Sequence, residues 1–150
     1  MTDPQAFVEI SSRSAAELAE AYLALWNEPD ADRRRGMIAE LWMEDGRHFL
    51  QPPQEIREIA AGPGLAITAN LEARGHDEIE ARAASAYEHW VGSEGLSFRG
   101  RDDAERLGDV VKFHWEAVAK DGELFGGGLN VLVLAADGRI ERDYTFVGGA

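Results

Sequence analysis

The sequence contains no cysteine, which excludes disulfides, thiol catalysis and metal sites built on cysteine. Positive charge is scarce, because 15 Lys and Arg stand against 28 Asp and Glu for a formal net charge of −13. Such a surface repels phosphates, so we expect neither a nucleic-acid partner nor an anionic membrane partner. No apolar run approaches the ~18 residues that a membrane span needs, and the N-terminus lacks a signal-peptide pattern, so a cytoplasmic location is predicted.

The remaining composition suits one globular domain over residues 1–150. Hydrophobic residues make up 45% of the chain, which is enough for a core, and no linker or repeat divides it. Helical spacing of apolar residues predicts helices over 14–27, 31–43 and 77–91. Capping boxes are expected at Ser14 with Glu17 and at Asp77 with Glu80.

From residue 92 onward, apolar residues alternate as they do in strands. Strands are predicted over 96–101, 110–119, 124–135 and 140–147, after an earlier short strand over 47–51 that follows a turn at 44–46. Asp121-Gly122 and Asp137-Gly138 indicate hairpins between the later strands. Residues 53–73 are predicted as a short helix followed by a lid. Helices first and a meander second indicate an α+β fold, in which three N-terminal helices pack in the concave face of a curved, mostly antiparallel sheet.

Several runs carry a resemblance to a known family. They are AYLALWNEPD (21–30), LWMEDGRHFLQPP (41–53), GHDEI (75–79), VVKFHWE (110–116) and GLNVLVLAADGRIERDYTF (128–146). In order and spacing, the sequence resembles the SnoaL-like branch of the nuclear transport factor 2-like superfamily. The resemblance implies a cystatin-like cone with a pocket at its open end. Relatives include ketosteroid isomerases, polyketide cyclases and non-catalytic binding domains, so the fold does not settle the function.

The resemblance also implies positions for catalytic groups. The hydrogen-bond donor of ketosteroid isomerases corresponds to Tyr22, and the second acid corresponds to Asn130, which cannot titrate. The base of those enzymes falls on Leu50 or Gln51, and neither is a carboxylate. Only the tyrosine donor is retained of the three functional groups, so steroid isomerase chemistry is not expected.

Two other residues are candidates for moving a proton. Polyketide cyclases of this branch place an acid on the last strand, and Asp143 is similar to it. Asp143 shares a strand face with Thr145, whereas Tyr144 and Phe146 share the other, so Asp143 is functional only if its face is concave. His48 on the first strand is the alternative base, because histidine titrates near neutral pH.

Aromatic and amide side chains are predicted to line the pocket. Trp115 is expected on the concave face, with Lys112, His114 and Glu116 outside. No spacing typical of metal ligands occurs, and neither a metal nor another cofactor is predicted. Gly126 to Gly128 suggest a bulge or a close backbone approach. The residues expected to contact a ligand are Trp26, Trp42, Gln51, Tyr87, Trp90, Trp115 and Asn130.

Two classes of function remain open from the sequence. In the first, the cone binds a small, mostly apolar molecule, with or without a carbonyl group. In the second, it is a cofactor-independent isomerase, cyclase or dehydratase that uses Asp143 or His48 as acid or base, with Tyr22 and Asn130 as oxyanion donors. The strand over 124–135 is apolar on both faces, so a homodimer through the outer face of the sheet is expected.

Overall fold

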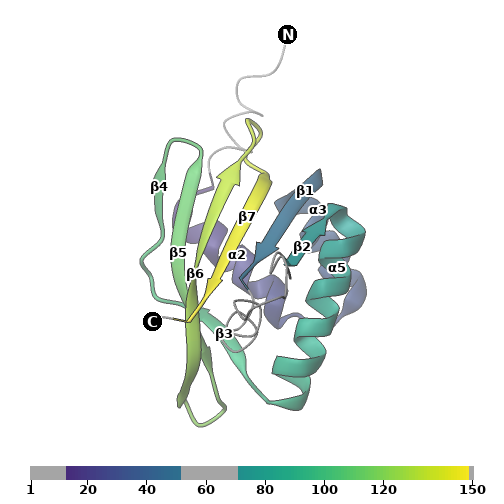
Figure 1. The fold of residues 1–150 in the computed structure, drawn as a ribbon. Coiled ribbons are helices and arrows are strands. Elements are labelled where there is room, and N and C mark those ends of the chain that lie inside the picture. Colours follow the sequence, from purple (N-terminus) through teal and green to yellow (C-terminus); the bar gives the residue numbers. More distant parts are fainter. Residues whose placement is uncertain (1–12, 52–70, 149–150) are drawn as a thin grey trace, which may run out of the picture.

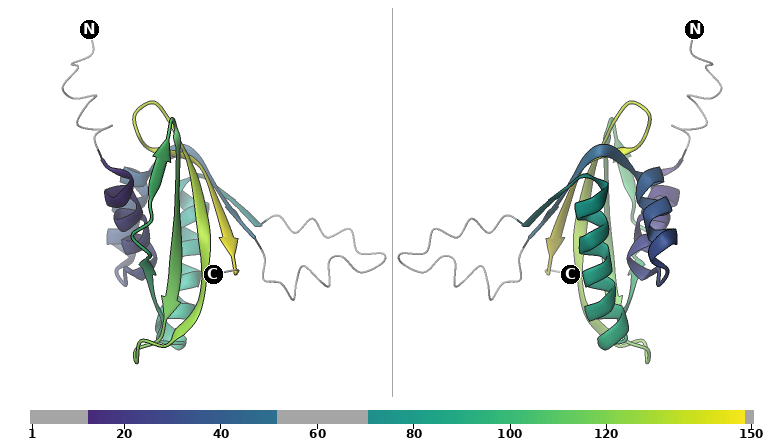
Figure 2. Two further views of the ribbon diagram at one scale, coloured as in Figure 1. Left: turned by 90° about the vertical axis from the view of Figure 1, so that its left-hand side faces the viewer. Right: turned by 90° about the vertical axis from the view of Figure 1, so that its right-hand side faces the viewer.

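The computed structural model describes residues 13–51 and 71–148, which form a curved sheet with helices against one side (Figures 1 and 2). The described helices are α2 (Ala15–Asn27), α3 (Ala31–Leu41) and α5 (Gly75–Ala86), and α5 continues as the π-helix η1 (Tyr87–Ser93). None of these helices is long and apolar enough to cross a membrane. The strands are β1 (Trp42–Leu50), β2 (Leu71–Arg74), β3 (Ser97–Gly100), β4 (Glu105–Leu107), β5 (Val110–Val118), β6 (Leu124–Leu134) and β7 (Ile140–Val147).

The sheet has the strand order β2-β1-β7-β6-β5-β3, and β4 pairs with β5 beside β3. The β1–β7 pair is parallel, and the other pairs are antiparallel. Helix α2 packs on the β3, β4 and β5 side, α5 packs on β1 and β2, and α3 contacts both helices. The predicted α+β cone is therefore confirmed, with three helices against a curved sheet.

Local sequence signals explain most of the element boundaries. The capping box that opens α2 is confirmed, because Ser14 Oγ accepts from the Glu17 N–H while the Glu17 carboxylate accepts from the Ser14 N–H. The capping box predicted at Asp77 is wrong. Helix α5 begins two residues earlier, where the backbone N–H of Arg74 bonds to the Glu78 carboxylate.

Several predicted elements differ from the structure. Helix α3 ends at Leu41, and β1 runs through the residues predicted as a turn at 44–46, with an irregular register opposite β7. The predicted lid over 53–73 lies mostly outside the described residues, but its last three residues belong to β2. Strand β4 was not predicted, because its three residues are all exposed and show no apolar alternation.

The predicted strands of the second half are confirmed to within about one residue at each end. Both hairpin turns place a glycine at positive φ, 87° for Gly122 and 89° for Gly138. The close approach expected in the glycine run occurs at Gly128. A Cβ there would lie 2.1 Å from the Phe146 carbonyl oxygen and 2.5 Å from the Trp115 ring, so only glycine fits.

Candidate functional site

A cavity of about 370 Å³ lies between the helices and the concave face of the sheet. Its walls come from α2, the end of β1, α5 with η1, and strands β3, β5, β6 and β7. Most of the lining is apolar or aromatic, and this volume falls within the usual range for small-molecule sites. The polar side chains among the described lining residues are Tyr22, His48, Gln51, Arg82, Asn130 and Thr145.

Strand register places the polar side chains together on one wall of the cavity. His48 lies beside Asp143 across the parallel β1–β7 pair, and Thr145 lies beside Asn130 across the β7–β6 pair. Because alternate residues of a strand share a face, these four side chains all point to the concave side. Tyr22 approaches them from α2, so the cluster unites four elements that are far apart in the sequence.

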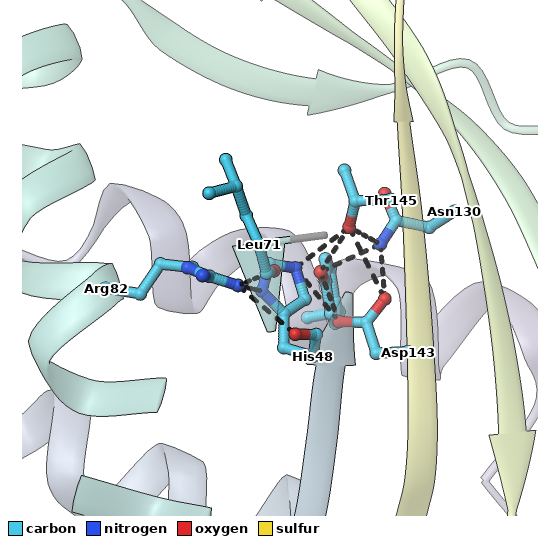
Figure 3. Close-up of polar contacts among 7 residues, drawn as sticks. His48, Leu71, Arg82, Asn130, Asp143 and Thr145 are labelled. Atoms are coloured by element: carbon cyan, nitrogen blue, oxygen red, sulfur yellow. Dashed lines mark hydrogen bonds and ion pairs between the residues drawn. The ribbon is translucent and has the colours of Figure 1, made fainter. Parts of the chain in front are cut away.

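Hydrogen bonds within this cluster converge on the Asp143 carboxyl group (Figure 3). The Tyr22 hydroxyl donates to Oδ2 at 2.6 Å, and the Asn130 amide donates to Oδ1 at 2.8 Å. The Thr145 hydroxyl lies 3.5 Å from Oδ1, and His48 Nε2 lies 3.6 Å from Oδ2. The Asn130 amide also lies within hydrogen-bond distance of the Tyr22 and Thr145 hydroxyls, so the donors are already engaged inside the protein.

Burial sets the protonation of the three titratable side chains in the cluster. Asp143 is fully buried, and loss of hydration raises the pKa of its carboxyl to about 7, although hydrogen bonds from Tyr22 and Asn130 oppose the rise. The pKa of His48 falls to about 3, first because the ring is buried and second because the Arg82 charge is close. Burial and the nearby Asp143 charge raise the pKa of Tyr22. At neutral pH His48 and Tyr22 are therefore uncharged, and Asp143 is half protonated.

Arg82 fixes the tautomer of His48. Its Nη1 donates to His48 Nδ1 at 3.0 Å and to the carbonyl oxygens of His48 and Leu71. Nδ1 of the neutral ring must then accept, so Nε2 carries the proton and donates to Thr145 Oγ1 at 3.0 Å. Neither Arg82 nor Thr145 was predicted as a site residue from the sequence. Arg82 interrupts the apolar stripe of Ile79, Ala83 and Ala86, and a charged residue at such a position could have indicated that it belongs to the site.

The structure brings most of the predicted site residues to the cavity. Tyr22, His48, Trp26, Gln51, Trp90, Trp115 and Asn130 all line it. Asp143 lies on the concave face, but it is one layer behind the lining, covered by the side chains that bond to it. His114 lies on the opposite face and pairs with Asp103, as the alternation along β5 indicated.

Two of the predicted ligand contacts, Trp42 and Tyr87, do not line the cavity. Trp42 is fully buried at the start of β1, where its ring packs 5.6 Å from that of Tyr22 in the closed core. Tyr87 belongs to η1 and lies under the Arg34 guanidinium, 5.5 Å from its ring centroid. The error for Trp42 follows from its assignment to a helix, because the chain turns into a strand at that residue.

The donor set of the site does not suit a metal ion. Within residues 13–51 and 71–148, no group of three His, Asp or Glu side chains is placed to share one. The side chains of the cluster can instead form hydrogen bonds and hold one proton. It combines a carboxyl that titrates near neutral pH with hydroxyl, amide and imidazole groups at the wall of an apolar cavity.

Comparisons with solved structures support this fold. A SnoaL-like family protein from Agrobacterium tumefaciens, described as a candidate isomerase, has a TM-score of 0.69 and 26% identity, over 88% of this chain and 95% of its own. A SnoaL-like protein from Burkholderia thailandensis has a TM-score of 0.59 and 18% identity, over 90% and 94%. A protein with a ketosteroid isomerase-like fold from Catenulispora acidiphila, in complex with trimethylamine, has a TM-score of 0.57 and 16% identity, over 87% of this chain and 84% of its own.

At the level of sequence, no family model and no curated protein matches the chain. The solved structures nevertheless show the fold, because the chain has the cone that a nuclear transport factor 2-like protein also has. The chain is similar to SnoaL-like proteins, as its sequence predicted.

Proposed function

We propose that the protein binds a small, largely apolar molecule in the cone cavity, with a polar group of that molecule against the Tyr22–Asn130–Thr145 wall. The observation that carries this proposal is an apolar cavity of about 370 Å³ with a single cluster of polar side chains on one wall. Trp26, Trp90 and Trp115 offer flat apolar surfaces to an aromatic ligand.

Filling the cavity tests the proposal. Gly126 shares the concave face of β6 with Asn130 and lines the cavity, and a Cβ added there meets no atom within 4 Å. Gly126→Phe should therefore fold and occupy the ligand space. Gly36 on the exposed face of α3 also has open space at its Cβ, so Gly36→Phe adds the same side chain away from the cavity.

The probe is 2-naphthamide, a neutral aromatic carbonyl compound, titrated by calorimetry. The wild type and Gly36→Phe should bind it with a dissociation constant of about 1 mM or tighter, as expected for a ligand of this size. Gly126→Phe should weaken binding by about tenfold or more, because its ring takes the place of the ligand. Equal binding by all three proteins, or no binding by the wild type, would contradict the proposal.

Proton transfer is the second candidate function, and the Asp143 carboxyl favours it. A group with a pKa of about 7 exchanges protons efficiently at neutral pH. Because Asp143 does not line the cavity, a proton would pass between it and a ligand through the Tyr22 or Thr145 hydroxyl, both of which line the cavity and lie near Asp143. The A. tumefaciens relative, a candidate isomerase, is consistent with such chemistry.

Deuterium exchange separates the enzyme from the binding module. In D₂O, an acid–base enzyme should speed the exchange of the C1 protons of 2-tetralone, an apolar ketone, and Asp143→Asn should lower that rate by about 10²-fold. The Asp103→Asn variant alters the acid on the opposite face and should leave the rate unchanged. If the wild type gives no rate above background, the protein only binds its ligand.

We also propose that the protein is a homodimer through the outer face of the sheet. Phe49 stacks on Tyr144 there with ring centroids 5.0 Å apart, and Val131 and Phe146 lie on the same face. Phe146 is 45% exposed and extends this apolar surface, and a contiguous exposed apolar patch is typical of an interface. Light scattering should show a dimer that Val131→Glu dissociates, whereas a 16.5 kDa wild-type monomer at micromolar concentration would contradict this assembly.

A further inference from the structure

Arg82 is the one charged side chain among the described residues that line the cavity. It extends from the middle of α5, and about half of it is buried. The remaining lining is apolar, aromatic or uncharged polar, and Asp143 lies behind it. The polar wall therefore has a single cationic position beside it, supplied by α5.

The hydrogen bonds of Arg82 use only part of its guanidinium group. All three recorded bonds leave from Nη1 and reach His48 Nδ1, the His48 carbonyl and the Leu71 carbonyl (Figure 3). The guanidinium has five N–H donors, and those on Nε and Nη2 make no hydrogen bond to any residue within 13–51 or 71–148. Nε and Nη2 together form the fork that matches a carboxylate in a bidentate pair.

The charge of Arg82 has no direct counter-ion in the described part of the chain. No carboxylate there lies within 4.0 Å of it, and Asp143 and Glu78 act on it only from farther away. Partial burial lowers the pKa of Arg82, which means that its charged form has lost hydration without gaining a contact ion pair. An anion supplied by a ligand would restore that missing interaction.

We propose that the ligand of the cavity is a small apolar carboxylate, whose carboxylate binds the Nε–Nη2 edge of Arg82 and whose apolar body lies against Trp26 and Trp90. This inference rests on the proposed binding function and names its ligand class. One guanidinium balances one negative charge, so a monocarboxylate fits better than a doubly charged phosphate, which would need further cations that the lining lacks.

The proposal has a consequence for Asp143. Near pH 7, Arg82 is the charged group that acts on the Asp143 carboxyl, because His48 and Tyr22 are neutral. A bound carboxylate neutralises the charge of Arg82. Because that positive charge lowers the pKa of Asp143, its neutralisation favours the protonated form of Asp143. The carboxylate should therefore bind more weakly at pH 8, where Asp143 is ionised, than at pH 6, whereas a neutral amide should show no such dependence.

The test compares 2-naphthoic acid with 2-naphthamide, which share the ring system and differ in charge. Calorimetry at pH 6 should show that the wild type binds the acid about tenfold more tightly than the amide, since hydrogen bonds to charged groups are the stronger ones. Arg82→Gln should remove this preference, so that the acid binds no more tightly than the amide. Arg106→Gln deletes the same charge from an exposed residue of β4 and should keep the preference.

The outcomes separate this inference from the proposed function. Amide binding without a preference for the acid, or a preference that survives in Arg82→Gln, overturns the carboxylate assignment and leaves the binding function standing. If the wild type binds neither compound, both fail. Should Arg82→Gln not fold, because Arg82 also bonds to two strand carbonyls, Arg82→Lys decides: a preference reduced severalfold supports the fork, and an unchanged one overturns it.

Discussion

The two faces of the sheet each carry a histidine beside an aspartate, and the pKa values of the two aspartates shift in opposite directions. On the concave face, His48 Nε2 lies 3.6 Å from Asp143 Oδ2, and both side chains are almost completely buried. On the convex face, His114 Nδ1 bonds to Asp103 Oδ2, and each side chain is 38% exposed. The same two residue types thus lie in two different dielectric environments on the two faces of the sheet.

Burial reverses the usual proton distribution in the inner pair. It raises the pKa of Asp143 to about 7 and lowers that of His48 to about 3, so the pair is neutral in weakly acidic solution. In the outer pair, partial burial also acts to raise the pKa of Asp103, but hydrogen bonds from the backbone and ring of His114 outweigh it and lower the pKa. Solvent access, rather than residue identity, decides whether the pKa of the aspartate rises or falls.

The largest expected difference between the two pairs is in stability. Asp143→Ala should lower the free energy of unfolding by about 3–5 kcal/mol, because it leaves the Tyr22 and Asn130 donors buried without an acceptor. Asp103→Ala should cost about 1 kcal/mol or less, since water replaces the lost partner. Urea denaturation measures both losses of stability, and equal losses would contradict the difference expected between the inner and the outer pair.

The pH dependence of stability distinguishes the two members of the inner pair. The raised pKa of Asp143 contributes stability that is fully present below about pH 3.8 and is lost as the pH rises through about 7. The lowered pKa of His48 contributes stability that is present above about pH 6.5 and is lost as the pH falls toward 3. Between about pH 4 and 6.5 the two effects cancel, because the pair holds one proton in both the folded and the unfolded state.

A variant that lacks one titratable group of the pair should show the pH dependence of the other group alone. As the pH falls from 6.5 to 4, the His48→Gln protein should gain stability and the Asp143→Asn protein should lose it, each by up to about 1.4 kcal/mol per pH unit. The wild type should show no slope from this pair. Urea denaturation at several pH values checks this, and parallel profiles for the two variants would refute the neutral-pair assignment.

A smaller effect is expected from the Tyr22 hydroxyl. The sequence suggested that Tyr22 donates to a ligand, but in the structure it donates to Asp143. Tyr22→Phe should therefore cost about 1–2 kcal/mol of stability and should raise the pKa of Asp143 further, because that hydrogen bond lowers it. NMR of the Asp143 carboxyl carbon measures the shift, and a pKa that does not change would mean that the bond contributes nothing.

The fold was predictable because its signals are local. The Ser14 capping box, the Asp-Gly hairpins and the alternation along β5, β6 and β7 each specify an element from a few neighbouring residues. Strand β4 and the start of β1 were missed, because the first has no apolar residue that is buried and the second contains Glu44 to Gly46, which are typical of a turn.

The site was only partly predictable because it depends on strand pairing. Both faces of β7 mix polar and apolar residues, so the sequence left open which face Asp143 shares with the cavity. The structure resolves this through register, since His48 and Asn130 on the neighbouring strands also point to the concave side. Burial and Arg82 then set the charge states, and neither can be inferred from residue spacing along β7.

A carbon-13 NMR titration of the Asp143 carboxyl, assigned with Asp143→Asn, tests the central claim most directly when the His48 ring is followed in the same samples. The account predicts that Asp143 titrates with a midpoint near pH 7 and that His48 gains no proton between pH 5 and 8. An Asp143 midpoint near pH 4, together with a His48 ring that becomes charged near pH 6.5, would show a buried ion pair instead. That result would contradict the neutral, proton-holding cluster on which the proposed chemistry of the cavity depends.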